Sequence, residues 1–128
     1  MKILLEKKEA LEYIHSALCN GLDYVSAYGL EIIQEKAYLE AKKDLITKGR
    51  EHFCYEDVLT NILAMGGSLK FYDHEGEEYE SFDLAQAKKN LESPMAVKHL
   101  LDIKNENDDA ITADCILQIC LFNDIIYG

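Results

Sequence analysis

The segment that most constrains the fold is residues 110–126, which carry apolar side chains on nearly every side of a helix. A helix without a polar face is stable only inside a hydrophobic core or against another subunit. We therefore expect this segment to be the central helix of the fold, with a homodimer through residues 110–126 as the alternative. Its apolar residues are Ile111, Cys115, Ile119, Phe122 and Ile126 on one face, and Ile116, Leu117, Cys120, Leu121 and Ile125 on the remaining sides.

Two amphipathic segments nearer the N-terminus predict further helices. Residues 4–19 have apolar side chains at helical spacing, and Asn20-Gly21 predicts the end of this helix, because both residues tolerate the left-handed conformation. Residues 33–48 show a second helical pattern, which ends before Gly49. The side of this second helix that we expect to face the core consists of Tyr38, Leu39, Lys42, Leu45 and Ile46.

Start signals indicate three more helices in the second half of the chain. Residues 55–65 have an apolar stripe and acidic residues in the first turn, which suit the positive end of a helix. Asp83 is a suitable N-cap for a helix over residues 84–91. Ser93-Pro94 predicts another start, with serine at the cap and proline at the first helical position.

The clearest strand pattern is at residues 68–73, where apolar and polar side chains alternate. Residues 74–76 predict a turn, and residues 77–82 return as the second strand of a hairpin. An isolated hairpin is barely stable, so it must pack on helices or join a third strand, for which residues 28–32 are the candidate. We therefore predict an α+β fold, with five to six helices packed on a β-hairpin or small antiparallel sheet.

Length and composition predict one globular domain over residues 1–128. An apolar content of 48% and a single proline favour a folded chain over a disordered one. The apolar run at residues 3–5 is too short for a signal peptide, and residues 115–122 are far short of the ~18 residues of a membrane span. The cysteines are therefore expected to be reduced thiols in the cytoplasm. They are Cys19, Cys54, Cys115 and Cys120.

The negative charge is concentrated in the later part of the chain. Residues 1–50 contain eight basic and eight acidic residues, so the whole net charge of -11 comes from residues 51–128. Such a field repels nucleic-acid phosphates and anionic membranes, and it attracts basic protein surfaces. Direct binding to nucleic acid or to a membrane is therefore not expected.

Tyrosines and acids alternate around the predicted hairpin and indicate a binding surface for a protein, which we expect to be basic. Tyrosine offers contact area at low entropic cost, and surrounding acids steer a basic partner toward it. We call this set the acidic hairpin. It consists of Tyr72, Asp73, Glu75, Glu77, Glu78, Tyr79 and Glu80.

A second candidate is a zinc site made of two histidines and two cysteines. His15 and Cys19 are four residues apart, which places both on one face of a helix, and His52 and Cys54 are two apart in a connecting segment. Together they would give a tetrahedral set of ligands. Cys54 also lies at a predicted helix start, where the dipole favours a thiolate, so a cysteine-dependent enzyme is a related alternative.

Other kinds of site lack the required pattern. Asp73, Glu75 and Glu77 alternate like the start of a calcium loop, but that loop needs glycine at its sixth position and glutamate at its twelfth. Here Gly76 is fourth and Leu84 is twelfth. No cofactor and no catalytic residue is assigned. The sequence therefore predicts a non-enzymatic accessory protein that binds another protein, with a small zinc-binding or cysteine-dependent enzyme as the alternative.

Overall fold

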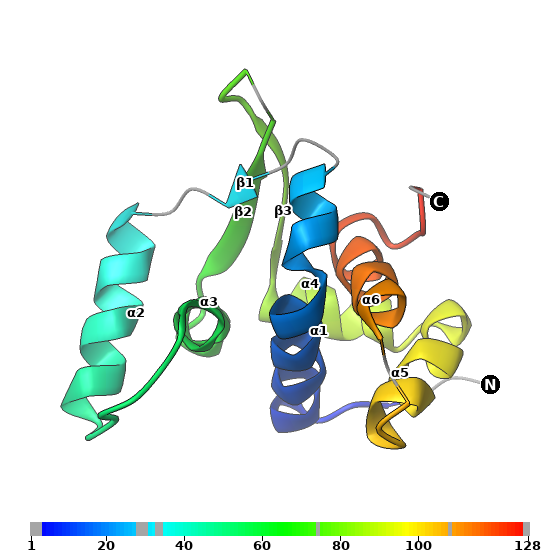
Figure 1. Ribbon diagram of the computed structural model, residues 1–128, viewed down its shortest axis with the longest axis horizontal. Coiled ribbons are helices and arrows are strands. Elements are labelled where there is room, and N and C mark those ends of the chain that lie inside the picture. Colours follow the sequence, from blue (N-terminus) through cyan, green and yellow to red (C-terminus); the bar gives the residue numbers. More distant parts are fainter. Residues whose placement is uncertain (1–3, 28–30, 33–34, 74, 108, 127–128) are drawn as a thin grey trace.

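The computed structural model describes residues 4–27, 31–32, 35–73, 75–107 and 109–126 (Figure 1). Within them, helices pack on a small antiparallel sheet, which confirms the predicted α+β class. In chain order the elements are α1 (Lys7–Ala27), β1 (Glu31–Ile32), α2 (Glu35–Thr47), α3 (Tyr55–Ala64), β2 (Ser68–Tyr72), β3 (Glu78–Asp83), α4 (Leu84–Leu91), the short 3₁₀ turn η1 (Pro94–Ala96), α5 (Val97–Lys104) and α6 (Ala110–Phe122).

The helix α6 lies at the centre of the core, as predicted. The side chains from Thr112 to Leu121 are buried, except for the half-buried Cys115. Contacts with α1, α4 and α5 cover it on several sides. A homodimer through residues 110–126 stays a prediction. The large apolar side chains that this segment exposes are Ile111 and Ile126.

The end of α6 differs from the expected end at residue 126. The helix stops at Phe122 because Asn123 adopts a left-handed conformation, with φ of 55°, which asparagine tolerates better than most residues. Beyond this cap the backbone N–H of Ile126 donates a hydrogen bond to Oε1 of Gln118 (2.9 Å). The chain thus folds back along α6, which leaves Ile126 49% exposed.

The predicted end of the first helix at Asn20-Gly21 is wrong, since α1 continues to Ala27. Gly21 is buried where α1 crosses α6. A Cβ atom at this position would lie 3.0 Å from the backbone carbonyl carbon of Ala113. The glycine therefore allows two helices to approach closely, and its conformational freedom is not used.

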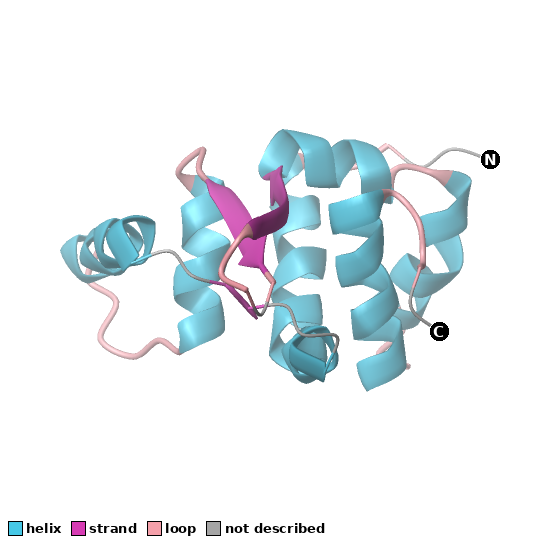
Figure 2. Cartoon of the chain, turned by 90° about the horizontal axis from the view of Figure 1, so that it is seen from above, coloured by secondary structure: helices cyan, strands magenta, loops and turns pink. Residues whose placement is uncertain are grey.

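The second helix forms within its predicted bounds, but its expected buried side is only partly correct. Leu45 is buried and Tyr38 half-buried, whereas Leu39 and Ile46 are 64% and 56% exposed. The reason is that α2 stands at one side of the molecule, at the left in Figures 1 and 2, and packs mainly on α3. Only a narrow stripe that includes Ala41 is covered. Lys42 is exposed, and residues 33–34 of the predicted helix lie outside the described residues.

The predicted hairpin forms the main part of a sheet with strand order β1-β2-β3. Leu69 pairs with Phe82 and Phe71 with Glu80 in an antiparallel register. The rings of Phe71 and Phe82 stack at 6.1 Å between centroids, both almost fully buried. The predicted third strand is present as β1, which pairs with the end of β2, while residues 28–30 lie outside the described residues.

Two predicted helix starts have different outcomes. The Asp83 carboxylate accepts a hydrogen bond from the backbone N–H of Gln86 (2.8 Å), which confirms its role as the N-cap of α4. Pro94 starts a 3₁₀ turn before the α-helix, and the Ser93 hydroxyl makes no capping hydrogen bond. Among the described helices, none is long and apolar enough to cross a bilayer.

Candidate functional site

The acidic hairpin projects beyond the helical body, upward in Figure 1 and toward the viewer in Figure 2. The adjoining parts of β2 and β3 are held in the core by Leu69, Phe71 and Phe82, which are at most 2% exposed. Glu80 lies on the same face of β3 as Phe82, because side chains two apart in a strand share a face. The register shifts between Phe71 and Tyr72, so Glu78 pairs with Tyr72 and does not share the face of Phe71 and Glu80. The face that is apolar at the base thus carries the exposed Glu80 further along.

A local hydrogen-bond network holds the turn of the hairpin in shape. The Asp73 carboxylate accepts hydrogen bonds from the backbone N–H groups of Glu75 (2.9 Å) and Glu77 (3.1 Å). Gly76 has a φ of +81°, which side-chain-bearing residues rarely adopt. Asp73 therefore has a structural role, although it was predicted as a contact residue.

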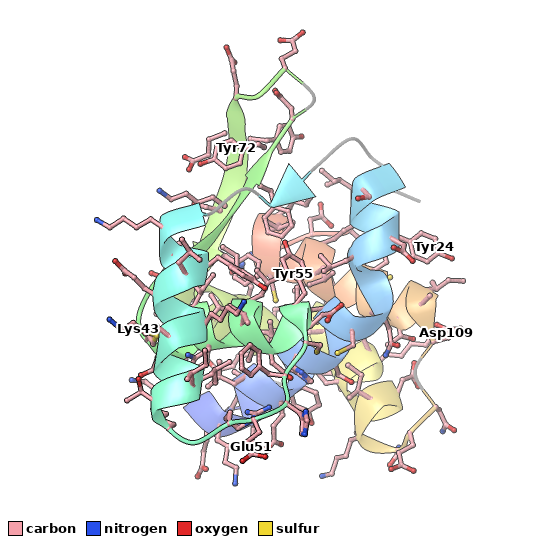
Figure 3. The ribbon with its side chains drawn as sticks, turned by 60° about the vertical axis from the view of Figure 1, so that its left-hand side comes forward. Tyr24, Lys43, Glu51, Tyr55, Tyr72 and Asp109 are labelled. Atoms are coloured by element: carbon pink, nitrogen blue, oxygen red, sulfur yellow. The ribbon has the colours of Figure 1, made fainter. Side chains whose placement is uncertain are left out.

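The two tyrosines of the acidic hairpin lie in different surroundings. Tyr79 is 47% exposed and packs edge-on against Phe122, with 5.9 Å between ring centroids. Tyr72 is half-buried at the end of β2 and is labelled on the projecting part of the hairpin in Figure 3. Because Phe122 fixes one face of Tyr79, that ring can offer its exposed part to a partner with little further loss of entropy.

The carboxylates of the acidic hairpin are close in sequence and open to solvent. Glu75, Glu77, Glu78 and Glu80 are all exposed. Among the described residues, the ion pairs at contact distance lie elsewhere, on α1, α2, α3 and α4 and in the α2–α3 connection. The tip therefore presents a concentrated negative charge that ion pairs of this kind do not offset.

A second group of polar side chains lies where α1 meets the N-terminus of α3. Nε2 of His15 is 2.7 Å from Oδ1 of Asp57. These residues are 42 apart in sequence, and the packing of α1 on α3 brings them together. Arg50 reaches the other carboxylate oxygen of Asp57 at 3.4 Å. Asp57 thus has a positive or proton-donating neighbour on each of its two oxygens.

Cys54 joins this group as the N-cap of α3. Its backbone N–H donates to Oδ2 of Asp57 (3.0 Å), and its sulfur faces the backbone N–H of Asp57 in return, which makes a capping box. One ligand atom from each of His15, Cys54 and Asp57 lies within 4.8 Å of the others. These three residue types are common zinc ligands.

Cys19 lies one helical turn after His15, beside the group but outside it. Its sulfur is 3.8 Å from Nε2 and 4.0 Å from Nδ1 of His15. Of the four residues predicted as zinc ligands, the structure places His15 and Cys54 in one group with Asp57, whereas Cys19 contacts His15 but lies outside this group. The fourth, His52, is exposed, and the metal-ligand group found among the described residues does not include it.

Asp57 was missed as a candidate ligand because its position in the first turn of a helix already had an explanation. An acidic residue there stabilises the helix dipole, and the sequence offers no further signal for a ligand. The three-residue spacing from Cys54 to Asp57 is that of a capping box, and this spacing would have placed both side chains at one helix end. The approach of His15 depends on tertiary packing and has no local signal.

The surroundings of the two thiols disfavour a nucleophilic cysteine. Burial raises the pKa of Cys19, and Glu56, Cys54 and Asp57 raise it further. The N–H of Asp57 lowers the pKa of Cys54, but Glu56, burial and the Asp57 carboxylate together raise it above its ordinary value. A catalytic thiol usually has a lowered pKa, so this geometry does not favour the cysteine-dependent enzyme.

The remaining cysteines belong to α6. Cys120 is fully buried, and burial strongly raises its pKa. Cys115 is half-buried, and burial also raises its pKa, followed by the effects of Asp114 and Asp109. Both behave as small core residues.

A solvent-open groove of about 480 Å³ runs beside the His15–Asp57 contact. Its walls come from α1, the end of α2, the α2–α3 connection and α3, and its lining is mixed polar and apolar, including Lys8, Glu12 and Thr60. Ions and small solutes therefore have an open path to His15 and Asp57, which line this groove.

Comparisons with known proteins give no guide to either site: no family model, curated protein or solved structure matches this chain.

Proposed function

We propose that this chain is a non-enzymatic accessory protein that binds a basic surface of another protein through the acidic hairpin. The observation that carries the proposal is the exposed group of carboxylates at the tip of a projecting hairpin, with the ion pairs of the described residues elsewhere. Charges at an exposed tip speed the encounter with an oppositely charged partner and set its orientation.

Within the acidic hairpin the residues have different proposed roles. Glu77, Glu78 and Glu80 supply the charge, since their side chains are exposed. Tyr79 supplies apolar contact area, and Asp73 keeps the turn in the shape that presents the others. We place this activity in the cytoplasm, which is supported by the free thiol state of all four cysteines.

The test is capture of partners from a cell extract by three immobilised proteins. The first is the unchanged chain, and the second carries Glu77→Lys, Glu78→Lys and Glu80→Lys. The third carries Glu40→Lys, Glu51→Lys and Glu106→Lys at exposed positions away from the hairpin, so that both variants have the same net charge. Mass spectrometry then compares the proteins that each retains.

A protein retained by the unchanged chain and by the third variant, but lost from the hairpin variant, supports the proposal. From typical exposed ion pairs, the loss of affinity should be roughly 10- to 100-fold. Equal retention by all three proteins would overturn the proposal, and so would equal loss from both variants, because total charge and not the hairpin would then govern capture.

A further inference from the structure

The junction of α1 and α3 combines four side chains of the types that bind zinc. We propose that His15, Cys19, Cys54 and Asp57 form a tetrahedral site for zinc or a similar soft divalent transition-metal ion. This site goes beyond the proposed protein-binding function and uses none of the residues of the acidic hairpin. It differs from the set predicted from the sequence because Asp57 replaces His52.

Two of the observed distances are close to those that a tetrahedral zinc site requires, whereas Cys19 lies further from Cys54 and Asp57 than such a site allows. Zinc bonds of ordinary length place a nitrogen and a sulfur ligand about 3.5 Å apart, and a nitrogen and an oxygen ligand about 3.3 Å apart. The sulfur of Cys19 lies 3.8 Å from Nε2 of His15, and Oδ1 of Asp57 lies 2.7 Å from the same nitrogen. Binding thus needs the histidine and aspartate to separate by roughly 0.6 Å. It also needs the sulfur of Cys19 to move toward Cys54 and Asp57, because Cys19 lies outside the group whose ligand atoms are all within 4.8 Å of one another.

The Asp57 carboxylate can bind a metal and still cap the helix, because its two oxygens have separate partners. Oδ2 accepts the N–H of Cys54 (3.0 Å) and lies 3.4 Å from Arg50, whereas Oδ1 faces His15. A metal ion would replace the proton shared between Oδ1 and Nε2. The hydrogen bonds on Oδ2 would then orient the ligand, as second-shell contacts do in metal sites.

The charges of the group also fit a divalent cation. Two thiolates, one carboxylate and a neutral histidine give one negative charge in excess of a divalent ion, and Arg50 supplies a compensating positive charge at Asp57. The N-terminus of α3 adds a favourable dipole at Cys54. Sulfur and imidazole ligands select zinc and related metals over magnesium and calcium, which prefer oxygen.

The proposed site has a structural consequence. Its ligands come from α1 and from the start of α3, so a bound ion would tie these helices together across the open groove. A ligand that binds only the folded state stabilises it by mass action. We therefore expect the unfolding temperature to rise with metal concentration.

The experiment titrates reduced protein, freed of any affinity tag, with Zn²⁺ under native mass spectrometry and with Co²⁺ under absorbance spectroscopy. Cys54→Ser is the decisive variant. Serine is a preferred N-cap, so this change keeps or improves the helix start while removing a metal ligand. Cys19→Ser removes the other sulfur. His52→Gln and Cys115→Ser are the matched controls, since they change a histidine and a cysteine outside the proposed set.

The expected result is one metal ion per unchanged chain, with the visible bands of tetrahedral cobalt and a near-ultraviolet sulfur-to-cobalt band. Loss of a second-shell partner costs up to about 100-fold in affinity, so loss of a ligand should cost at least that much in Cys54→Ser and Cys19→Ser. Both controls should bind like the unchanged chain. The metal-free unfolding temperature of Cys54→Ser should be no lower than that of the unchanged chain.

Three results would overturn the site. The first is the absence of stoichiometric binding to the unchanged chain, and the second is unchanged affinity in Cys54→Ser. The third is loss of binding in His52→Gln, which would return His52 to the ligand set. None of these results bears on the capture experiment, so the metal site and the protein-binding function can fail separately.

Discussion

The central helix α6 and the acidic hairpin meet where Tyr79 packs edge-on against Phe122, but their side chains have opposite surroundings. Ile119 on α6 is fully buried, whereas Glu77, Glu78 and Glu80 on the hairpin are exposed. Burial of the apolar side chains of α6 contributes favourably to the free energy of folding. Folding does not require a cluster of exposed like charges on a projection, and net charge of one sign opposes the compact state. This contrast is why we assign stability to α6 and binding to the hairpin.

The largest effect on stability is expected from Ile119→Asp. It places a carboxylate in the centre of the core without a partner, which costs several kcal/mol out of a total of about 5–15 kcal/mol. Circular dichroism should show a largely unfolded chain. The matched control is Ile111→Asp on the same helix, where the side chain is 62% exposed and the change should be within about 0.5 kcal/mol. A folded monomeric Ile119→Asp variant would instead identify α6 as a subunit interface.

Gly21→Ala should have the next largest effect, with α1 forced away from α6. The added Cβ would lie 3.0 Å from the carbonyl carbon of Ala113. Overpacking costs about 1–3 kcal/mol and outweighs the gain of up to about 1 kcal/mol in helix propensity. Chemical denaturation should show net destabilisation, while Asn20→Ala at the neighbouring exposed position should not destabilise the protein. Stabilisation by Gly21→Ala would contradict the close helix contact.

The N-cap of α6 predicts a smaller, pH-dependent effect. The backbone N–H of Thr112 donates to the Asp109 carboxylate and lowers its pKa. Because the pKa is lower in the folded state, this stabilisation is present above the ordinary pKa of aspartate and is lost as the pH falls through the folded value. Asp109→Asn keeps a capping oxygen but no titratable group. Its unfolding temperature should therefore fall less on acidification than that of the unchanged chain, and an equal fall would contradict the assignment.

The smallest effect on stability is expected from the hairpin variant with Glu77→Lys, Glu78→Lys and Glu80→Lys. These side chains are exposed, so the free energy of unfolding should change by less than about 0.5 kcal/mol, or rise slightly as repulsion is relieved. Thermal unfolding measures this directly. A large loss of stability would contradict the separation between a folding core and a binding hairpin.

Local sequence patterns predicted those parts of the fold that are determined locally. Alternation at residues 68–73 identified a strand, and Asp83 identified a helix start. The same reasoning failed where the outcome depends on packing. The helices α2 and α6 both have 13 residues, but α2 packs mainly on α3 and leaves Leu39 and Ile46 exposed. The apolar pattern in the sequence of α2 does not indicate how few other elements this helix packs against.

The candidate sites show the same limit. The acidic hairpin lies within one stretch of chain, so its exposed glutamates could be identified by sequence alone, whereas the turn-stabilising role of Asp73 could not. The group at the α1–α3 junction joins residues 42 apart, and only the structure places Asp57 beside His15. His15 and Cys19 were found because four-residue spacing on a helix is a local signal.

The central claim is that binding depends on the acidic hairpin, and the most direct test is a set of dissociation constants measured at increasing salt. The partner is the protein recovered by capture, and the three proteins compared are the unchanged chain, the hairpin variant and the equally charged control variant. The unchanged chain and the control should bind tightly at low salt and weaken as salt screens the charges, while the hairpin variant should bind weakly throughout. Equal affinity and equal salt dependence for the hairpin variant and the unchanged chain would contradict the claim.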